Sequence, residues 1–134
     1  MQVKLLSTLH EDEATTYKVL YKSKLVAYIP ECFYKYYQRD CSIMTSGLEK
    51  RYPDYILSIK ERIQYFQERG ERVLADHSIL RVLEYVKYIY RNVSSEKKEE
   101  VGMLYNQMIK EYGIPQTIKT KKKLALLLWK FVKA

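Results

Sequence analysis

Apolar residues recur at helical spacing along the stretch from Pro53 to Leu74. The members of this stripe are Ile56, Ile59, Ile63, Phe66 and Val73. Side chains three or four residues apart share one face of an α-helix. Pro53 is compatible with a first helical turn, where its missing N–H has no intrahelical partner to lose. The pattern predicts a helix over 53–74 with a buried apolar stripe, whereas Arg62, Arg69 and Arg72 fall on other faces.

Two further stretches repeat the helical pattern. The first carries Ile79, Leu83, Val86 and Tyr90, and the second carries Val101, Leu104, Tyr105, Met108 and Tyr112. Ser94 or Ser95, followed by Glu96, is typical of a cap at the start of the second helix. Gly113 tolerates the left-handed conformation of a C-terminal cap, and Pro115 lies just beyond it. The second helix is therefore expected to end at Gly113.

The N-terminal pattern has two interpretations. From His10 to Ile29, three acidic residues precede four apolar ones, Tyr17, Tyr21, Leu25 and Tyr28, at spacings that favour a helix. A β-hairpin is the alternative, because two β-prone stretches flank the tripeptide at 22–24. Pro30 ends either element, since a proline pushes the preceding residue out of the α region. A short aromatic helix is predicted over Glu31–Arg39.

The C-terminal part is expected to be a small appendage. Residues 114–120 are predicted to be a linker, and Lys121 to Val132 a final helix. These elements give an all-α fold, a helical bundle with a short basic C-terminal appendage. The predicted organisation is a helical domain over 1–113, followed by a linker and basic segment over 114–134.

Length and composition agree with one compact helical domain. The chain has 134 residues, of which 47% are hydrophobic and 30% charged, with 4 Gly and 3 Pro. It is too apolar for a disordered chain and too poor in turn residues for a sandwich of many strands. No apolar run approaches the roughly 20 residues that cross a bilayer, and no secretory leader is evident. We therefore expect a soluble protein without a membrane partner, in the cytoplasm and associated with the nucleoid, or in the nucleus of a eukaryote.

Positive charge concentrates at the C-terminus. The net charge is +8, and six lysines with no acidic residue lie in the last sixteen positions, which leaves +2 for residues 1–118. The cluster Lys119, Lys121, Lys122 and Lys123 is the candidate nucleic-acid contact, with Trp129 and Phe131 able to stack on a base. The alternative is a solvated charged surface beside a docking face at Leu124 to Trp129.

Residues with catalytic or metal-binding chemistry are few. His10 and His77 are far apart in sequence, and nine positions separate Cys32 from Cys41, unlike the spacing of common zinc ligands. The chain has no Gly-rich phosphate loop and no Gly-x-Ser-x-Gly segment. A nucleophile pair of Cys32 with His77 has no local support beyond the residue types. We predict no catalytic residues, no metal site, no cofactor and no enzymatic activity.

The chain contains 14 tyrosines, which is its most unusual feature. Several fall on predicted apolar faces, at Tyr17, Tyr28, Tyr65, Tyr85 and Tyr105. They fit a core in which the ring is buried and the hydroxyl reaches the edge. They fit equally well a protein interface, because tyrosine is enriched at the centres of interfaces.

Three short motifs follow one another in a definite order. Ile29-Pro30 with Phe33-Tyr34 comes first, then Phe66 to Val73, then Ser95 to Glu100 leading to Leu104-Tyr105. They resemble three segments of the GINS family, in its archaeal Sld/Psf-type subunits: Leu-Pro-x-x-Phe-Tyr, Arg-x-x-Lys-Ile and Glu-Glu-x-x-Leu-Tyr. Arg72 stands where the second segment usually has Lys. The resemblance covers residues 9–112.

The resemblance implies a non-catalytic scaffold subunit that supports the replicative DNA helicase. Its implied partners are a second GINS-type subunit, the MCM helicase and a RecJ-like protein, and DNA is a further possible contact. Subunits of this type usually end in a small β-rich domain, whereas about twenty residues follow Gly113 here. The predicted partner-binding residues are Phe33, Tyr34, Arg69, Arg72, Tyr105 and Trp129. The alternative function is a small basic nucleic-acid-binding protein, of viral or chromatin type, that uses the lysine cluster.

Overall fold

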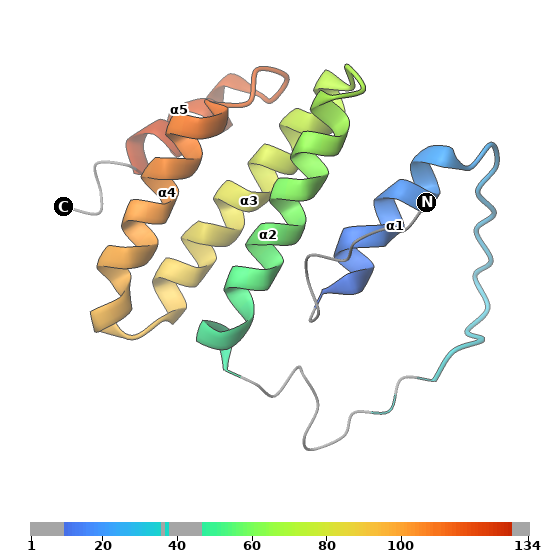
Figure 1. Ribbon diagram of the computed structural model, residues 1–134, viewed down its shortest axis with the longest axis horizontal. Helices are drawn as coiled ribbons and strands as arrows, with labels where there is room; N and C mark the ends of the chain where they lie inside the picture. The colour runs from blue at the N-terminus through green and yellow to red at the C-terminus, as the bar shows by residue number, and fades with distance from the viewer. Residues whose placement is uncertain (1–9, 36, 38–46, 130–134) are drawn as a thin grey trace. The chain divides into compact units, whose positions relative to one another are not determined.

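All secondary structure in the described part of the chain is helical, which confirms the all-α fold class. The structure is a computed structural model that describes residues 10–35, 37 and 47–129. Its elements, labelled in Figure 1, are α1(Glu11–Lys22), α2(Leu48–Gln67), α3(Arg72–Asn92), η2(Ser95–Lys97), α4(Lys98–Tyr112) and α5(Thr120–Trp129). They belong to two compact units, Met1–Ser58 and Ile59–Ala134. Among the described residues, no helix is long and apolar enough to cross a membrane.

The first unit contains α1 and the first half of α2. Its buried side chains are Ala14, Tyr17, Tyr52, Ile56 and Ser58. The ring of His10 meets the edge of Tyr55, with ring centroids 5.2 Å apart. The helix predicted from His10 is therefore present, and Ala14 and Tyr17 lie three residues apart on its buried side.

The predicted extent of this first helix was wrong. The helix ends at Lys22, Ser23 is extended with φ −74° and ψ 131°, and residues 24–35 form neither helix nor strand. Leu25 and Tyr28 continue the helical spacing but are exposed. An apolar helical stripe that has no surface to pack against adds little stability to a helix. The β-branched residues Val26 and Ile29 and the proline at position 30 then favour the non-helical conformation seen here. The hairpin alternative is likewise absent from the described residues.

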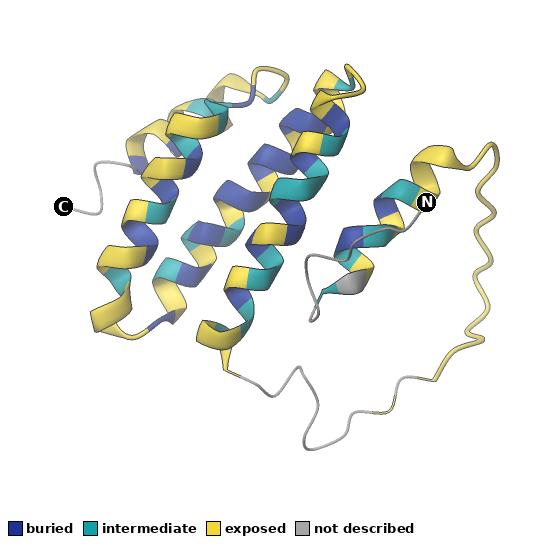
Figure 2. Ribbon diagram, in the orientation of Figure 1, coloured by how far each residue is buried: buried dark blue, intermediate teal, exposed yellow. Residues whose placement is uncertain are grey.

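The short aromatic helix predicted over Glu31–Arg39 is also contradicted where the structure describes it. Residues 31–35 and 37 are non-helical and exposed, as Figure 2 shows in yellow for the segment after α1. Positions 36, 38 and 39 lie outside the described residues, as does Cys41. Aromatic side chains have low intrinsic helix propensity, and here no tertiary packing compensates for it.

The second unit is a helical bundle with a continuous apolar interior. The fully buried aliphatic side chains come from three helices and are Ile59, Ile63, Val82, Leu83, Val86, Ile89, Val101 and Met108. Helices α3 and α4 run side by side in Figure 1, and each turns a buried stripe inward in Figure 2. The stripes predicted for both helices are confirmed at Ile79, Leu83, Val86 and Val101.

The long helix predicted over 53–74 is in fact two helices. Helix α2 begins at Leu48, five residues before Pro53, and ends at Gln67. Gly70 then adopts φ +71°, its N–H donates to the Gln67 carbonyl at 3.0 Å, and the N–H of Glu71 donates to the Phe66 carbonyl at 2.9 Å. These bonds form a Schellman motif, which satisfies carbonyls at the end of a helix. Val73 consequently lies on α3, where it is exposed instead of joining the α2 stripe.

The end of α4 matches the prediction, and the segment after it is held in place. Gly113 has φ +74°, and its N–H donates to the Ile109 carbonyl at 2.9 Å. Pro115 is fully buried. The loop leads into α5, so the final helix predicted from Lys121 is present through Trp129. Ring contacts of Trp129 with Tyr90 and Tyr105 join α5 to α3 and α4.

Candidate partner-binding surface

An apolar segment, residues 19–35 and 37, contains ten of the eighteen exposed large hydrophobic side chains in the described part of the chain. Its exposed large side chains are Val19, Leu20, Tyr21, Leu25, Val26, Tyr28, Ile29, Phe33, Tyr34 and Tyr37. The exposed fraction reaches 88% at Tyr28, 80% at Phe33 and 81% at Tyr34. Scattered exposed hydrophobic residues are ordinary, but contiguous apolar surface of this kind marks an interaction site. We call residues 19–35 and 37 the apolar segment.

Beyond Ser23, where α1 has ended, the backbone of this segment is also open. None of the described residues from 24 to 37 forms a hydrogen bond with another described residue. Extended chain with open N–H and C=O groups can pair with the backbone of another protein, while alternate side chains enter pockets of that partner. The segment therefore presents two complementary means of binding, apolar side chains and unpaired backbone groups.

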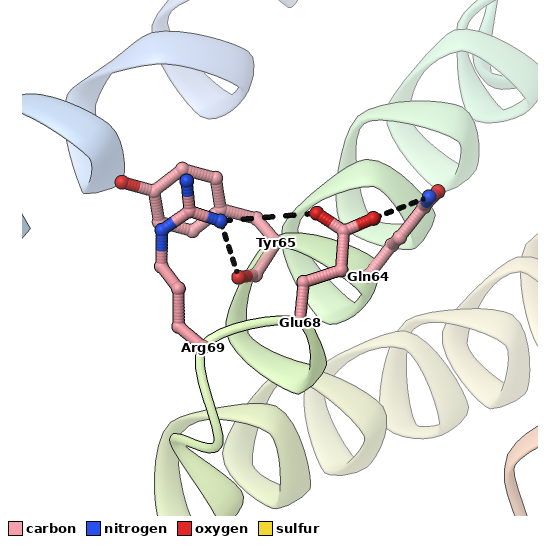
Figure 3. A network of polar contacts seen from close by, with 4 residues as sticks. All are labelled: Gln64, Tyr65, Glu68 and Arg69. Atoms are coloured by element: carbon pink, nitrogen blue, oxygen red, sulfur yellow. Dashed lines mark hydrogen bonds and ion pairs between the residues drawn. The ribbon is translucent and has the colours of Figure 1, made fainter.

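Arg69, which was also predicted to bind a partner, is held in a defined orientation (Figure 3). Its guanidinium carbon lies 3.5 Å from the centroid of the Tyr65 ring, and Nη1 donates to the Tyr65 carbonyl at 2.9 Å. Nη1 also lies 3.8 Å from Oε2 of Glu68, whose Oε1 accepts a 2.8 Å bond from the amide of Gln64. No other described residue forms a hydrogen bond or ion pair with Arg69. Its Nε and Nη2 donors thus form an open edge suited to a carboxylate or phosphate.

Arg72 lies beyond the turn, at the first position of α3, and is exposed. The Schellman motif at Gly70 places Arg69 and Arg72 on either side of the same turn. The two cations predicted to lie on one helix therefore lie in the turn after α2 and at the start of α3.

Tyr105 and Trp129, which were predicted to bind a partner, lie instead in the bundle core. Tyr105 has no exposed surface, and Trp129 is 9% exposed. The Tyr105 hydroxyl donates to the Leu126 carbonyl at 2.8 Å. The centroids of the Tyr105 and Trp129 rings are 4.4 Å apart. A side chain without exposed surface does not meet a partner while the bundle is closed. Their role here is to fasten α5 to α4.

Burial of Tyr105 raises the pKa of its hydroxyl to about 12. An unfolded tyrosine ionises near pH 10, so from roughly pH 10 to pH 12 the unfolded chain releases a proton that the folded chain keeps. We therefore expect stability to fall with rising pH across this window, and Tyr105→Phe to flatten that fall. The variant also loses one buried hydrogen bond, about 1 kcal/mol at neutral pH. Urea melts at a series of alkaline pH values measure both effects; parallel curves for the two proteins would contradict the expectation.

The lysine cluster lies at the start of α5 and is partly engaged. Lys119 and Lys121 are exposed, Nζ of Lys122 lies 3.4 Å from Oε1 of Glu84, and Nζ of Lys123 lies 3.4 Å from the Gln116 side-chain oxygen. Ion pairs as exposed as the Lys122 pair contribute little stability. The cluster remains positive because one acidic residue faces several cations. Lys130 and Lys133 lie outside the described residues.

His77 and Cys32, the two residues considered as a nucleophile pair, are both exposed. Within the described ranges, no three His, Cys, Asp or Glu side chains are grouped as metal ligands would be. The structure therefore adds no geometric support for a Cys/His pair or a metal centre.

One functional side chain was missed by the sequence analysis. Asp76 is 8% exposed, and its Oδ2 accepts the backbone N–H of Gln116 at 2.7 Å and of Thr117 at 2.8 Å. It ties the loop before α5 to α3, forty residues away in sequence. The available signal was an acidic residue within the apolar face that contains Ala75 and Ile79, since buried charges are rare unless they have partners.

Comparisons with known proteins were made at three levels. No family model, no curated protein and no solved structure matches this chain.

Proposed function

We propose that this protein is a non-catalytic scaffold subunit that pairs with a second helical chain in a complex of the GINS type. The observation that carries the proposal is the exposure of the apolar segment. Covering apolar surface stabilises a complex by about 25 cal/mol per Å² removed from water, before the costs of association. Ten large hydrophobic side chains exposed along one stretch supply that driving force.

The apolar segment also contains the first motif of the resemblance. Ile29, Phe33 and Tyr34 are among its exposed side chains, and Pro30 lies between them. Aromatic residues are enriched among those that dominate binding energy, especially when a partner encloses them. The first of the three motifs is thus well placed to be covered by another subunit.

Arg69 supports the proposal independently of the apolar segment. Its guanidinium is fixed by the Tyr65 ring and carbonyl, so binding a partner's carboxylate costs less side-chain entropy than it does for a mobile arginine. Its open edge accepts a carboxylate in a bidentate manner. We assign Arg69, and Arg72 across the turn, to a separate polar contact with the partner, made by the second unit.

The resemblance also implies a place for the assembled complex. In a complex of this type the subunit contributes contacts between the MCM helicase and a RecJ-like protein and performs no chemistry of its own. On this proposal the protein acts where DNA is replicated, at the nucleoid or in the nucleus.

The test is co-expression with a second GINS-type subunit from the same organism. The native chain is expected to form a stable hetero-oligomer, and the double variant Phe33→Ser, Tyr34→Ser to bind at least roughly tenfold more weakly. Both side chains are about four-fifths exposed, so the thermal melt of the isolated variant is expected to match that of the native chain. Calorimetric titration measures the affinity.

The matched control is Tyr88→Ser, which removes an exposed aromatic ring from α3, outside the apolar segment. It is expected to bind the partner as the native chain does. A native chain that stays monomeric with the partner, or a double variant that binds like the control, would refute the proposal.

A second candidate function is nucleic-acid binding through the lysine cluster. Lys119 and Lys121 are the observation that favours it, because both are exposed and neither forms an ion pair with a described residue. Phosphate contacts of this kind bind without sequence preference and release counterions. The cluster follows a loop that Asp76 fixes, which gives its cations a defined position.

For this candidate we expect affinity for single-stranded DNA to fall as salt rises. The log-log slope is about 0.7 per neutralised phosphate, so Lys119→Gln with Lys121→Gln lowers it by roughly 1.4. Deleting residues 119–134 is a poor test, because it also removes the buried Leu126 and Trp129. Lys110→Gln, on exposed α4 surface, is the matched control. An unchanged slope in the double variant, measured by fluorescence anisotropy, would exclude this contact.

A further inference from the structure

The second unit contains a cavity of about 360 Å³ between the turn that precedes α3 and the loop that follows α4. This volume lies within the range of roughly 300–1,000 Å³ found for small-ligand sites. The turn contributes Gly70 and the loop contributes Gly113 and Ile114, while α3 supplies Asp76 and Arg72. Of these lining residues, only Arg72 is assigned to the proposed contact with a partner.

Asp76 brings a buried carboxylate to the wall of this cavity. Its Oδ2 is occupied by the two backbone N–H groups of the loop. No described residue donates to its Oδ1. A carboxylate has capacity for about four hydrogen bonds, and a buried negative charge gains most from a cationic donor. One oxygen therefore serves the fold, and the other is available to a ligand.

Arg72 brings the opposite charge to the same wall. It precedes Asp76 by four residues on α3, a spacing at which the Cβ atoms of a helix lie about 5–6 Å apart and ion pairs commonly form. Nevertheless, Arg72 forms no ion pair with Asp76 or with any other described acidic residue. The cavity is thus lined by an acidic and a basic residue that form no ion pair with each other.

The rest of the lining is mainly apolar or lacks side chains. Ala75, Ile79 and Ile114 contribute aliphatic surface, and the ring of Tyr112 adds an aromatic wall. Two effects raise the pKa of the Tyr112 hydroxyl: burial, which is the larger, and a hydrogen bond with Glu111. The hydroxyl is therefore neutral. Gly70 and Gly113 leave open space where a Cβ would otherwise lie.

We propose that this cavity binds a small zwitterion, an α-amino acid with an aliphatic side chain. Its ammonium group donates to Oδ1 of Asp76, and its carboxylate accepts from the guanidinium of Arg72. Its side chain lies against Ile79, Ile114 and the Tyr112 ring. An α-amino acid carries both charges on one carbon, so it spans the gap between two side chains one helical turn apart. This site goes beyond the scaffold role and does not depend on it.

The test is a titration of the full chain, labelled with ¹⁵N, using L-leucine as the probe. Saturable shifts are expected at the backbone amides of Gly70, Gly113 and Gln116, which line the cavity. Two matched analogues each keep the aliphatic part and one charge: isoamylamine lacks the carboxylate, and 4-methylpentanoate lacks the ammonium group. Each is expected to bind at least roughly tenfold more weakly, because each loses one charge-assisted contact.

Arg72→Gln separates the two contacts without disturbing the loop that Asp76 holds. It is expected to weaken leucine binding roughly tenfold while leaving isoamylamine binding unchanged. Arg91→Gln, at an exposed arginine near the other end of α3, is the control and should bind leucine normally. The proposal is overturned if leucine causes no saturable shift, if isoamylamine binds as tightly as leucine, or if Arg72→Gln retains native affinity.

Discussion

Ile63→Ala is expected to lower the free energy of unfolding by about 2–5 kcal/mol, the usual range for truncating a buried aliphatic side chain. Ile63 is fully buried in the second unit, in the middle of the stripe formed by Ile59 and Phe66. The substitution loses transfer energy and leaves a cavity that surrounding helices fill only in part. Urea denaturation followed by circular dichroism measures the change.

Val73→Ala is the matched control, since it also shortens a β-branched side chain in a helix. Val73 is exposed on α3, so its truncation is expected to stay within about 0.5 kcal/mol. The pair of variants tests the break between α2 and α3. Equal costs at the two positions would mean that Val73 continues the buried stripe and that the turn at Gly70 is misplaced.

Trp129→Ala is expected to have the other large effect, about 3–5 kcal/mol. The indole contacts the Tyr105 ring at 4.4 Å and the edge of Tyr90 at 5.3 Å between centroids. It is buried, and Lys87 lies over it with Nζ 5.8 Å from the ring centroid. Removing it takes away the largest side chain that joins α5 to the bundle. Thermal melts followed by circular dichroism serve here, because Trp129 is the sole tryptophan and its fluorescence is lost.

Leu128→Ala is the control for Trp129, because Leu128 is the adjacent residue of α5 and is exposed. It is expected to change stability by less than about 0.5 kcal/mol. If Trp129→Ala left the melt unchanged and weakened only association with a partner, the tryptophan would belong to an interface and its place in the core would be wrong.

The sequence determined the fold class and the faces of the main helices. Ile56, Ile59 and Ile63, and likewise Ile79, Leu83 and Val86, lie at mixed spacings of three and four that a helix, but not a strand, places on one side, and the structure buries them all. The C-terminus of α4 was also predictable, because Gly113 and Pro115 leave few other conformations. Both successes rest on local rules in which residue type and spacing fix the outcome.

Where two helices share one pattern, the sequence did not place the break between them. Phe66 and Val73 are seven residues apart, a spacing that continues a helical stripe across Gly70. Glycine within a helix costs only about 1 kcal/mol, so its presence alone does not end one. After this turn α3 buries an apolar stripe that includes Val82, Leu83 and Val86 in the bundle, a tertiary contact that spacing alone does not predict.

The apolar segment shows the reverse case. Tyr21, Leu25 and Tyr28 have helical spacing, yet the helix stops at Lys22. Periodicity indicates a helix only if some surface covers the resulting stripe, and the described chain leaves this one exposed. The sequence therefore indicated which residues are apolar, and the tertiary structure showed that the described part of the chain does not bury them.

Among the candidate site residues, the sequence by itself identified the chemical types and the tertiary structure decided their roles. Arg69 was selected as a partner contact, and the structure adds that its guanidinium stacks on the ring of Tyr65, four residues earlier. Tyr105 and Trp129 are of residue types that are common in interfaces, but they lie in the core because α5 packs against α4. Asp76 meets the N–H groups of Gln116 and Thr117 across forty residues of sequence. Local spacing carries no information about such long-range contacts, since burial and pairing depend on which helices pack together.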